Sequence, residues 1–204
     1  MRAVSLFAPP LCAACRRPAV AEAVLCPACR RALEPLGPTP VGLADVSIWA
    51  PFSYGGPTRA VVRRLKFGRA AALADHMAAS IAASAPDGFL ANPLVPVPSP
   101  ARRRRVRGFC HATLLAEALG RRTGLPVLEL LERVGGTGRQ VGRARSQRLR
   151  TPPRFSAPHG APGPVVLVDD VITTGATLSA CASALREAGC SCEGALAYAR
   201  TPVR

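Results

Sequence analysis

The stretch of sequence that decides the fold is VVLVDDVITTGAT, residues 165–177. Its first four residues form an unbroken valine and leucine run, which predicts a strand buried on both faces of a sheet. A helix is expected over 176–188, because apolar side chains recur there at helical spacing, at Leu178, Cys181, Ala182 and Leu185. Gly189 ends that helix, and residues 194–198 predict a final strand. A buried strand followed at once by an amphipathic helix is typical of an α/β fold.

The polar residues between this strand and this helix form a candidate anion-binding turn. Asp169 and Asp170 follow the strand at its carboxyl end, where open α/β sheets bind ligands and where paired carboxylates can hold ribose hydroxyls or Mg²⁺. The helix start leaves backbone N–H groups unpaired beside the positive end of its dipole, and Gly175 permits close approach. Further hydroxyl donors are Thr173, Thr174 and Thr177. The segment is not a Walker A loop, and the alternative is an ordinary strand-end turn with a threonine cap and solvated aspartates.

Strand-like and helix-like segments alternate along the chain before this unit, as expected for an α/β sheet. The expected strands are 46–54, 94–97 and 127–131. The expected helices are 57–67, with Pro57 in its first turn, an alanine-rich helix that ends near residue 84, and 112–122. Residues 133–163 form a long connection with little periodicity, which predicts a functional or mobile loop.

Four of the eight cysteines form two paired motifs near the start of the chain. Cys12-x-x-Cys15 and Cys26-x-x-Cys29 are separated by ten residues, a spacing that lets two short loops meet around one tetrahedral Zn²⁺. Disulfides and free thiols are the alternatives, and disulfides are rare in a cytoplasmic chain. We therefore expect a four-cysteine, zinc-ribbon-like module with its linker over residues 1–42, and a second domain over residues 43–204.

The chain carries a large positive charge, with 27 Lys and Arg against 12 Asp and Glu and a net charge of +15. Such a surplus fits nucleic acid or small polyanions such as phosphate esters as partners, and a solvated basic face is the alternative. The arginines gather in two internal runs, residues 102–107 and 139–154, which favours loops around a site over a flexible tail. No stretch has the roughly 20 apolar residues that a membrane span needs, so we expect a cytoplasmic protein with no membrane partner.

Residues 166–177 resemble the 5-phosphoribosyl-1-pyrophosphate (PRPP) motif of type I phosphoribosyltransferases. Residues 46–204 are similar to the ComF competence-protein family, relatives of glutamine amidophosphoribosyltransferase, which usually begins with a four-cysteine zinc module. The supporting residues are Leu65-Lys66-Phe67, Pro96-Val97-Pro98, Arg107-Gly108-Phe109, Gln140, Arg148 and Phe155. The resemblance implies a type I phosphoribosyltransferase fold: a mostly parallel sheet with helices on both faces and a mobile hood or loop, preceded by the zinc module.

The resemblance also implies roles for individual residues. Asp169 and Asp170 would contact the ribose hydroxyls, and the segment Val171 to Thr177, including Ala176, would hold PRPP through its 5-phosphate. Ser99 and Arg104, in the loop after Pro98, would face the pyrophosphate, with Mg²⁺ bound alongside PRPP. Lys66 and Arg107 would assist catalysis together with the two aspartates, and residues 133–155 would close over the substrate.

Two positions depart from the family pattern. Cys110-His111 replaces the usual Asn-Gln, and Gln147 and Thr151 replace the usual Glu and Asn. Cys110 has no assigned role, and none of the three histidines is expected to have a ligand-like neighbour. Among the remaining cysteines, Cys181 is expected in the core, and Cys190 and Cys192 at the entry to the last strand.

Two functions from different classes follow from these residues. The first is pentosyl transfer at ribose C1 with loss of pyrophosphate, in which electrostatic stabilisation of the leaving group does most of the work. The second is a non-catalytic DNA-uptake factor that uses the fold to bind single-stranded DNA or a competence-machinery protein. The intact acid pair with Thr-Thr-Gly favours the first function, and an aromatic content of 4% offers few stacking platforms for the second. Transcriptional regulation by PRPP is a third interpretation.

Overall fold

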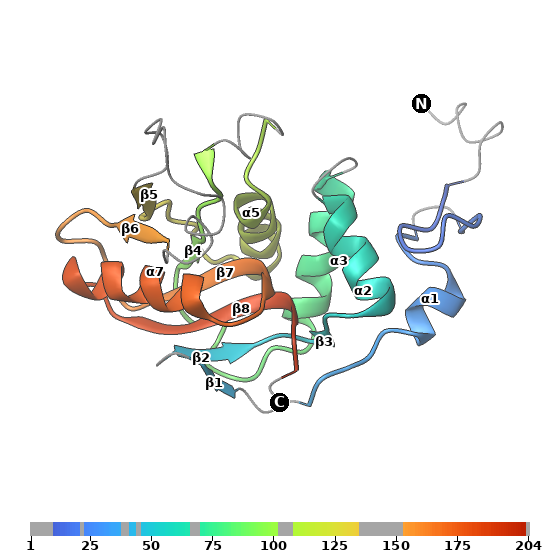
Figure 1. Ribbon diagram of the computed structural model, residues 1–204, viewed down its shortest axis with the longest axis horizontal. Helices are drawn as coiled ribbons and strands as arrows, with labels where there is room; N and C mark the ends of the chain where they lie inside the picture. The colour runs from blue at the N-terminus through green and yellow to red at the C-terminus, as the bar shows by residue number, and fades with distance from the viewer. Residues whose placement is uncertain are drawn as a thin grey trace, which may run out of the picture.

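The computed structural model describes residues 10–20, 23–37, 41–43, 46–65, 70–101, 108–134 and 153–202. Its centre is a six-stranded sheet of order β1-β2-β8-β7-β4, in which β3 also pairs with β8 (Figure 1). The strands are β1 (Val41–Leu43), β2 (Val46–Trp49), β3 (Phe52–Ser53), β4 (Leu94–Pro96), β7 (Val165–Ile172) and β8 (Cys192–Arg200). Every pairing is parallel except that of β1 with β2, so the sheet is mostly parallel as predicted.

Helices cover both faces of this sheet. The first face packs against α2 (Gly56–Leu65), α3 (Ala70–Ala82) and α5 (His111–Thr123), and the second against α7 (Ala176–Glu187). Alternate side chains of β7 enter the two cores, with Val166 and Val168 in the first and Val165 and Leu167 in the second. This confirms the prediction of an α/β protein whose central strand is buried on both faces. None of the helices within the described residues has the length and apolar character that crossing a membrane requires.

The predicted strand over 46–54 is wrong in one respect, because the structure divides it into β2 and β3. Both halves pair in parallel with β8, and Pro51 lies between them. Proline has no N–H to donate to a ladder, and it therefore interrupts a strand that the apolar pattern alone continues.

Two further predictions are corrected in the second half of the chain. Residues 127–131 are not a strand, although Val127 makes a single bridge to Leu94. The described part of 133–163 is not structureless, because β5 (Glu132–Val134) pairs antiparallel with β6 (Arg154–Ser156). The Arg133 guanidinium lies 5.5 Å from the centre of the Phe155 ring across this ribbon. β5 and β6 have three residues each and, unlike β4, are not continuously apolar, so the sequence pattern misses them.

The cysteine-bearing segment packs directly onto the domain that follows it. Cys12, Leu25 and Cys26 belong to the same buried core as Trp49 of β2. The chain after α1 (Pro27–Arg31) runs beside β3, where the Ser53 amide donates to the Glu34 carbonyl at 2.9 Å. The stretch predicted as a linker over 35–42 therefore includes paired residues, and the predicted boundary between residues 42 and 43 falls inside β1.

At Gly120, α5 packs closely against the loop that follows the helix. A Cβ atom added there would lie 2.8 Å from the Leu125 carbonyl oxygen and 2.9 Å from the Val127 Cγ2 atom. Alanine gains about 1 kcal/mol of helix propensity over glycine, but overpacking costs roughly 1–3 kcal/mol, and a backbone carbonyl cannot move cheaply. Gly120→Ala is therefore expected to lower the free energy of unfolding, measured by urea denaturation.

The matched control is Gly42→Ala, because Gly42 is exposed and nothing lies within 4 Å of its added Cβ. Its free energy of unfolding should stay within about 0.5 kcal/mol of the parent value. A Gly120→Ala protein as stable as the parent would show that α5 does not pack this closely against residues 125–127.

Candidate functional site

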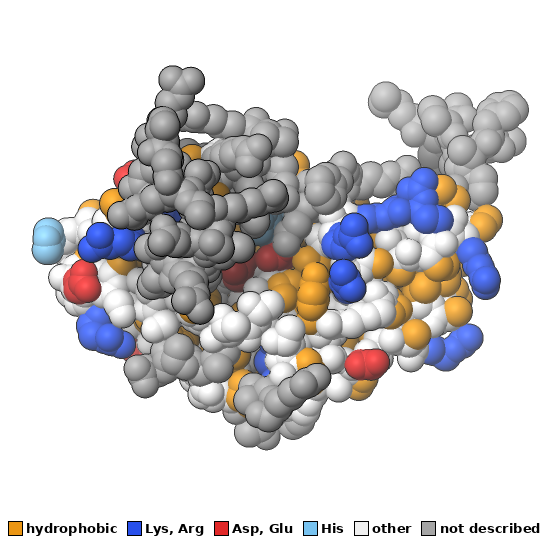
Figure 2. All heavy atoms as spheres, viewed as in Figure 1, with side chains coloured by type: hydrophobic (Ala, Val, Ile, Leu, Met, Phe, Trp, Pro, Cys, Tyr) orange, Lys and Arg blue, Asp and Glu red, His pale blue; other side chains and the backbone are white. Residues whose placement is uncertain are grey.

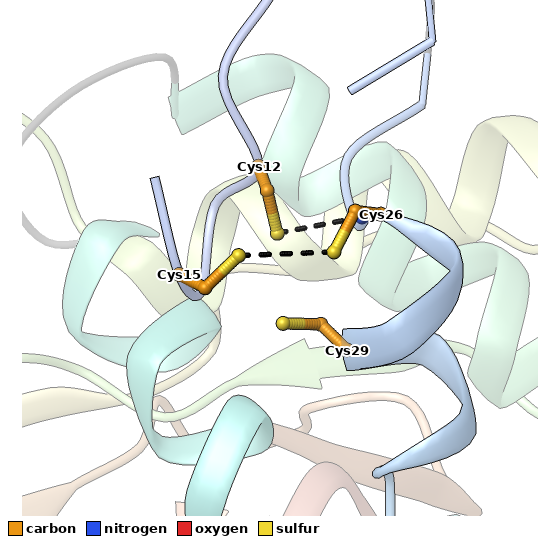
Figure 3. Close-up of side chains that lie close together, drawn as sticks. All are labelled: Cys12, Cys15, Cys26 and Cys29. Atoms are coloured by element: carbon orange, nitrogen blue, oxygen red, sulfur yellow. Dashed lines mark hydrogen bonds between the residues drawn. The ribbon is translucent and has the colours of Figure 1, made fainter. Parts of the chain in front are cut away.

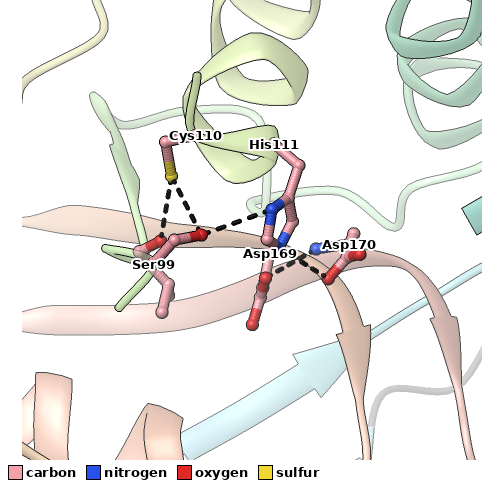
Figure 4. Close-up of polar contacts among 6 residues, drawn as sticks. Ser99, Cys110, His111, Asp169 and Asp170 are labelled. Carbon is pink, nitrogen blue, oxygen red and sulfur yellow. Dashed lines mark hydrogen bonds and ion pairs between the residues drawn. The ribbon is translucent and has the colours of Figure 1, made fainter. Parts of the chain in front are cut away.

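The polar residues of the site gather where β4 and β7 end and α5 begins (Figure 4). Asp169 and Asp170 lie in the last part of β7, where Asp169 is half-buried and Asp170 is only 3% exposed. The Asp170 amide donates to the Asp169 Oδ1 atom at 2.8 Å, which fixes one carboxylate against the strand. The acids were expected to follow the strand, but they lie within β7, just beyond Val168, the residue that pairs with the last residue of β4.

His111 joins this pair from the first residue of α5. Its Nε2 atom lies 3.4 Å from Asp170 Oδ1, and its Nδ1 atom lies 3.3 Å from the Ser99 hydroxyl oxygen. The imidazole is buried, since His111 is 8% exposed. The contact arises because Asp170 follows Val166 and Val168 on the alternating face of β7 that α5 covers. The expectation that no histidine has a ligand-like neighbour is therefore wrong for His111.

Cys110 is the N-cap residue of α5 and lies beside the same serine. Its thiol donates to the Ser99 hydroxyl at 3.4 Å and to the Val97 carbonyl at 3.8 Å. Burial raises the pKa of the Cys110 thiol, but hydrogen bonds with Ser99 and Thr113 outweigh burial and lower the pKa below its usual value. Burial raises the pKa of Cys181 and Cys192, which are packed against the second core. Cys110 is thus distinct in its surroundings from both.

The turn between β7 and α7 has the backbone geometry of an anion site. Gly175 is the N-cap of α7 with φ 73°, a left-handed conformation that disfavours other residues. Thr173 and Thr174 are exposed. The hydroxyl of Thr201, the residue after β8 (Cys192–Arg200), donates to the Thr173 carbonyl at 3.2 Å and supports the turn. Glycine has no side chain to cap α7, so the first N–H groups of the helix are available to a ligand.

A pocket of about 400 Å³ adjoins the site on the other side of Ser99. It lies between the end of β4, the start of β5, and residues 108–114, which comprise the first turn of α5 and the residues just before it. Its polar lining includes Ser99, Cys110 and Thr113 together with three exposed carboxylates, Glu117, Glu129 and Glu132. Neither Asp169 nor Asp170 lines this pocket, so the acid pair and the pocket are neighbours that share the serine.

The four N-terminal cysteines form a second site (Figure 3). The four sulfur atoms all lie within 4.8 Å of one another, and those of Cys15 and Cys26 are 3.7 Å apart. Tetrahedral Zn²⁺ with Zn–S bonds of about 2.3 Å would separate its ligands by roughly 3.8 Å. All four residues are free cysteines, and 3.7 Å is far longer than a disulfide bond. The cluster therefore has the donor set and spacing to bind zinc.

Mutual proximity also alters the acidity of these thiols. Burial raises the pKa of Cys12, but hydrogen bonds from Cys26 and Cys15 outweigh it and lower the pKa to about 6. Burial and the neighbouring sulfurs raise the pKa of Cys29 to about 12. Four thiolates repel one another at this distance, and a divalent cation at their centre removes that repulsion.

Three residues predicted to act at the site lie outside the described residues: Lys66, Arg104 and Arg107. Gln147 and Thr151, which depart from the family pattern, lie outside them as well. Ser99, Asp169, Asp170 and the segment Val171–Thr177 are all described. The predicted residues that come together are Ser99 and the two aspartates, with Cys110 and His111 added by the structure. The one sequence signal for Cys110 and His111 is their position after the Arg-Gly-Phe motif, where the chain departs from the family pattern.

No protein-family model matches the chain. The chain is similar to the competence protein ComFC of Bacillus subtilis (strain 168), with 37% identity over 98 residues. The matched region covers 47% of this chain and 39% of ComFC, so the chain spans less than half of that relative. The fold and site define an α/β protein with a mostly parallel sheet and a four-cysteine cluster, and its similarity to ComFC supports the resemblance to the ComF family.

Proposed function

We propose that this chain is a ComF-family, phosphoribosyltransferase-like protein that binds PRPP at the end of β7. The observation that carries the proposal is the succession of an acid pair, an exposed Thr-Thr turn and a left-handed Gly175 at the start of α7. This succession offers carboxylates to sugar hydroxyls and backbone N–H groups to a phosphate, within one continuous segment. The similarity to ComFC supports a link to competence.

Different residues would bind different parts of PRPP. Asp169 and Asp170 accept hydrogen bonds from the ribose hydroxyls, while Thr173, Thr174 and the α7 amides hold the 5-phosphate. Ser99 follows β4 and contacts His111, which in turn contacts Asp170, so Ser99 would face the pyrophosphate from the α5 side of the acid pair. Mg²⁺ bound with PRPP would neutralise charge on the departing pyrophosphate. The reaction that this supports is pentosyl transfer, in which the C1–O bond to pyrophosphate breaks and a bond to a nitrogen nucleophile forms.

The four-cysteine cluster is proposed to hold one structural Zn²⁺. A closed set of four protein sulfurs leaves no position for substrate or water, which is the pattern of structural sites. Its two buried cysteines lie in the core shared with β2. The metal would therefore stabilise the packing of residues 10–37 onto the sheet.

Nucleic-acid binding is the second candidate function. Basic side chains (blue) gather over α2 and the cysteine-bearing segment, whereas acidic side chains (red) lie near the centre of the same face (Figure 2). The last turn of α2 contributes Arg63 and Arg64, and α1 contributes Arg30 and Arg31. Binding dominated by phosphate contacts would weaken steeply as the salt concentration rises. An affinity for single-stranded DNA that does not change with ionic strength would exclude binding of this kind.

The proposed PRPP site is tested by replacing the glycine that opens α7. Gly175→Ala forces a side chain onto φ 73° and displaces the amides that hold the phosphate. We expect PRPP affinity with Mg²⁺, measured by calorimetry, to fall about tenfold or more, which corresponds to about 1.4 kcal/mol.

The matched control is Gly189→Ala, because Gly189 has a similar φ of 82° after the other end of the same helix, with nothing within 4 Å of its added Cβ. The control carries similar backbone strain and should bind PRPP like the parent. If the parent protein shows no heat of binding with PRPP and Mg²⁺, the proposed function is wrong. If both glycine variants lose affinity equally, the assignment of the phosphate to this turn is wrong.

A further inference from the structure

We propose that His111, Asp169 and Asp170 together bind one divalent first-row transition metal, directly and before any substrate arrives. The proposal rests on the proposed function in locating the sugar-phosphate site at this acid pair. It goes further in assigning to the protein a cation of its own there, held through an imidazole. The three side chains come from two elements, α5 and β7, which meet on one face of the sheet.

The distances between the donor atoms suit a single ion. One atom from each residue, an imidazole nitrogen and two carboxylate oxygens, lies within 4.8 Å of the other two, and His111 Nε2 is 3.4 Å from Asp170 Oδ1. Ligands bound at about 2.1 Å in an octahedral shell are about 3.0 Å apart when adjacent and about 4.2 Å apart when opposite. Shifts of a few tenths of an ångström therefore bring all three atoms into bonding range.

The surroundings of His111 orient it as a ligand. Its Nδ1 atom lies 3.3 Å from the Ser99 hydroxyl, and a hydrogen donated there leaves the Nε2 lone pair directed at Asp170. In that tautomer, a cation bound to both Nε2 and Asp170 Oδ1 would replace the proton that otherwise joins these two atoms. Metal-binding histidines typically have their second nitrogen hydrogen-bonded in this way. The 2.8 Å hydrogen bond from the Asp170 amide orients Asp169 similarly.

The donor set selects the kind of metal. Carboxylates suit Mg²⁺ and Mn²⁺, whereas imidazole suits transition metals, so one nitrogen and two oxygens fit a first-row divalent transition ion, for which Mn²⁺ is a suitable probe. Mg²⁺ gives up its water reluctantly and gains little from a nitrogen ligand. The soft sulfur cluster at the N-terminal end prefers zinc, and the two sites should therefore load with different ions. Three protein ligands leave positions in the metal shell for water or phosphate oxygens.

The probe is Mn²⁺ alone, added to the full chain already loaded with zinc and free of PRPP. Calorimetry and the loss of the free Mn²⁺ resonance signal should report one ion per chain. His111→Gln installs the residue that the resembled family usually has and should weaken Mn²⁺ binding about tenfold or more. The control is His159→Gln, because His159 is exposed and lies outside the site, and it should bind Mn²⁺ like the parent.

A second measurement needs no variant, so it holds even if His111→Gln fails to fold. Pulsed electron resonance of the parent protein with Mn²⁺ should show coupling to a directly bound imidazole nitrogen. Absence of Mn²⁺ binding, or binding without nitrogen coupling, would overturn the inference.

A parallel titration of the parent with PRPP and Mg²⁺ separates this inference from the proposed function. PRPP binding without Mn²⁺ binding would defeat the metal site and leave the proposed function standing. Mn²⁺ binding with nitrogen coupling but without PRPP binding would support the metal site and defeat the proposed function.

Discussion

A Cys12→Ser protein is expected to lose its zinc and a large part of its stability. Serine cannot supply a thiolate, and three remaining sulfurs bind zinc far more weakly than four. Cys12 is fully buried, and with Leu25 and Cys26 it belongs to the core that contains Trp49, so the loss reaches the sheet. We expect metal analysis to fall from about one zinc per chain to near zero, and the free energy of unfolding to fall by on the order of 4 kcal/mol.

The matched control for this experiment is Cys192→Ser. Cys192 is half-buried at the start of β8, where its thiol donates to the Gly194 carbonyl at 3.5 Å, a role that a hydroxyl can take over. Its zinc content should equal that of the parent protein. Full zinc content in Cys12→Ser would disprove the four-sulfur site.

A protein carrying Asp169→Asn and Asp170→Asn is expected to bind PRPP with Mg²⁺ about 100-fold more weakly than the parent. Hydrogen bonds to charged groups contribute about 1.5–3 kcal/mol each, and the double change removes both carboxylates at once. Because Asp170 is 3% exposed, its contacts are poorly screened by water. Calorimetric titration of PRPP measures the change, and thermal unfolding checks that the variant is folded.

Asp75→Asn is the control for the acid pair. Asp75 is exposed and pairs with Arg121 at 2.9 Å, and such surface pairs contribute at most about 1 kcal/mol to stability. It removes one carboxylate at a distance from β7 and should leave PRPP affinity unchanged. Equal affinity in the parent and the Asp169→Asn, Asp170→Asn protein would contradict the assignment of the ribose to these residues.

The parts of the fold that sequence patterns predicted are those whose pattern is local and long. The helices α5 and α7 agree with the predicted ranges to within one residue at each end, because apolar residues recur over three turns. The first half of β7 is equally clear, since residues 165–168 are all apolar, as expected of a strand buried on both faces. The errors fall on short strands: Pro51 divides the first, and β5 and β6 have three residues each.

The candidate site shows the same division. The acid pair, the Thr-Thr-Gly turn and the paired cysteines are contiguous or regularly spaced, so the sequence alone singles them out as candidates. His111 could not be found in this way, because its contact with Asp170 exists only once α5 packs across β7. The contact joins segments far apart in the chain, and no local pattern encodes such a meeting.

The shared core of the cysteine segment and the sheet has a consequence for how the molecule melts. Leu25 and Cys26 belong to the same buried cluster as Trp49 and Val61, so neither part of the chain keeps its complete core without the other. We therefore expect the cysteine-bearing segment and the sheet to unfold together, as one cooperative unit. A fragment that begins at β2 would expose the apolar side chains that the cysteine-bearing segment normally covers, and we expect it to aggregate.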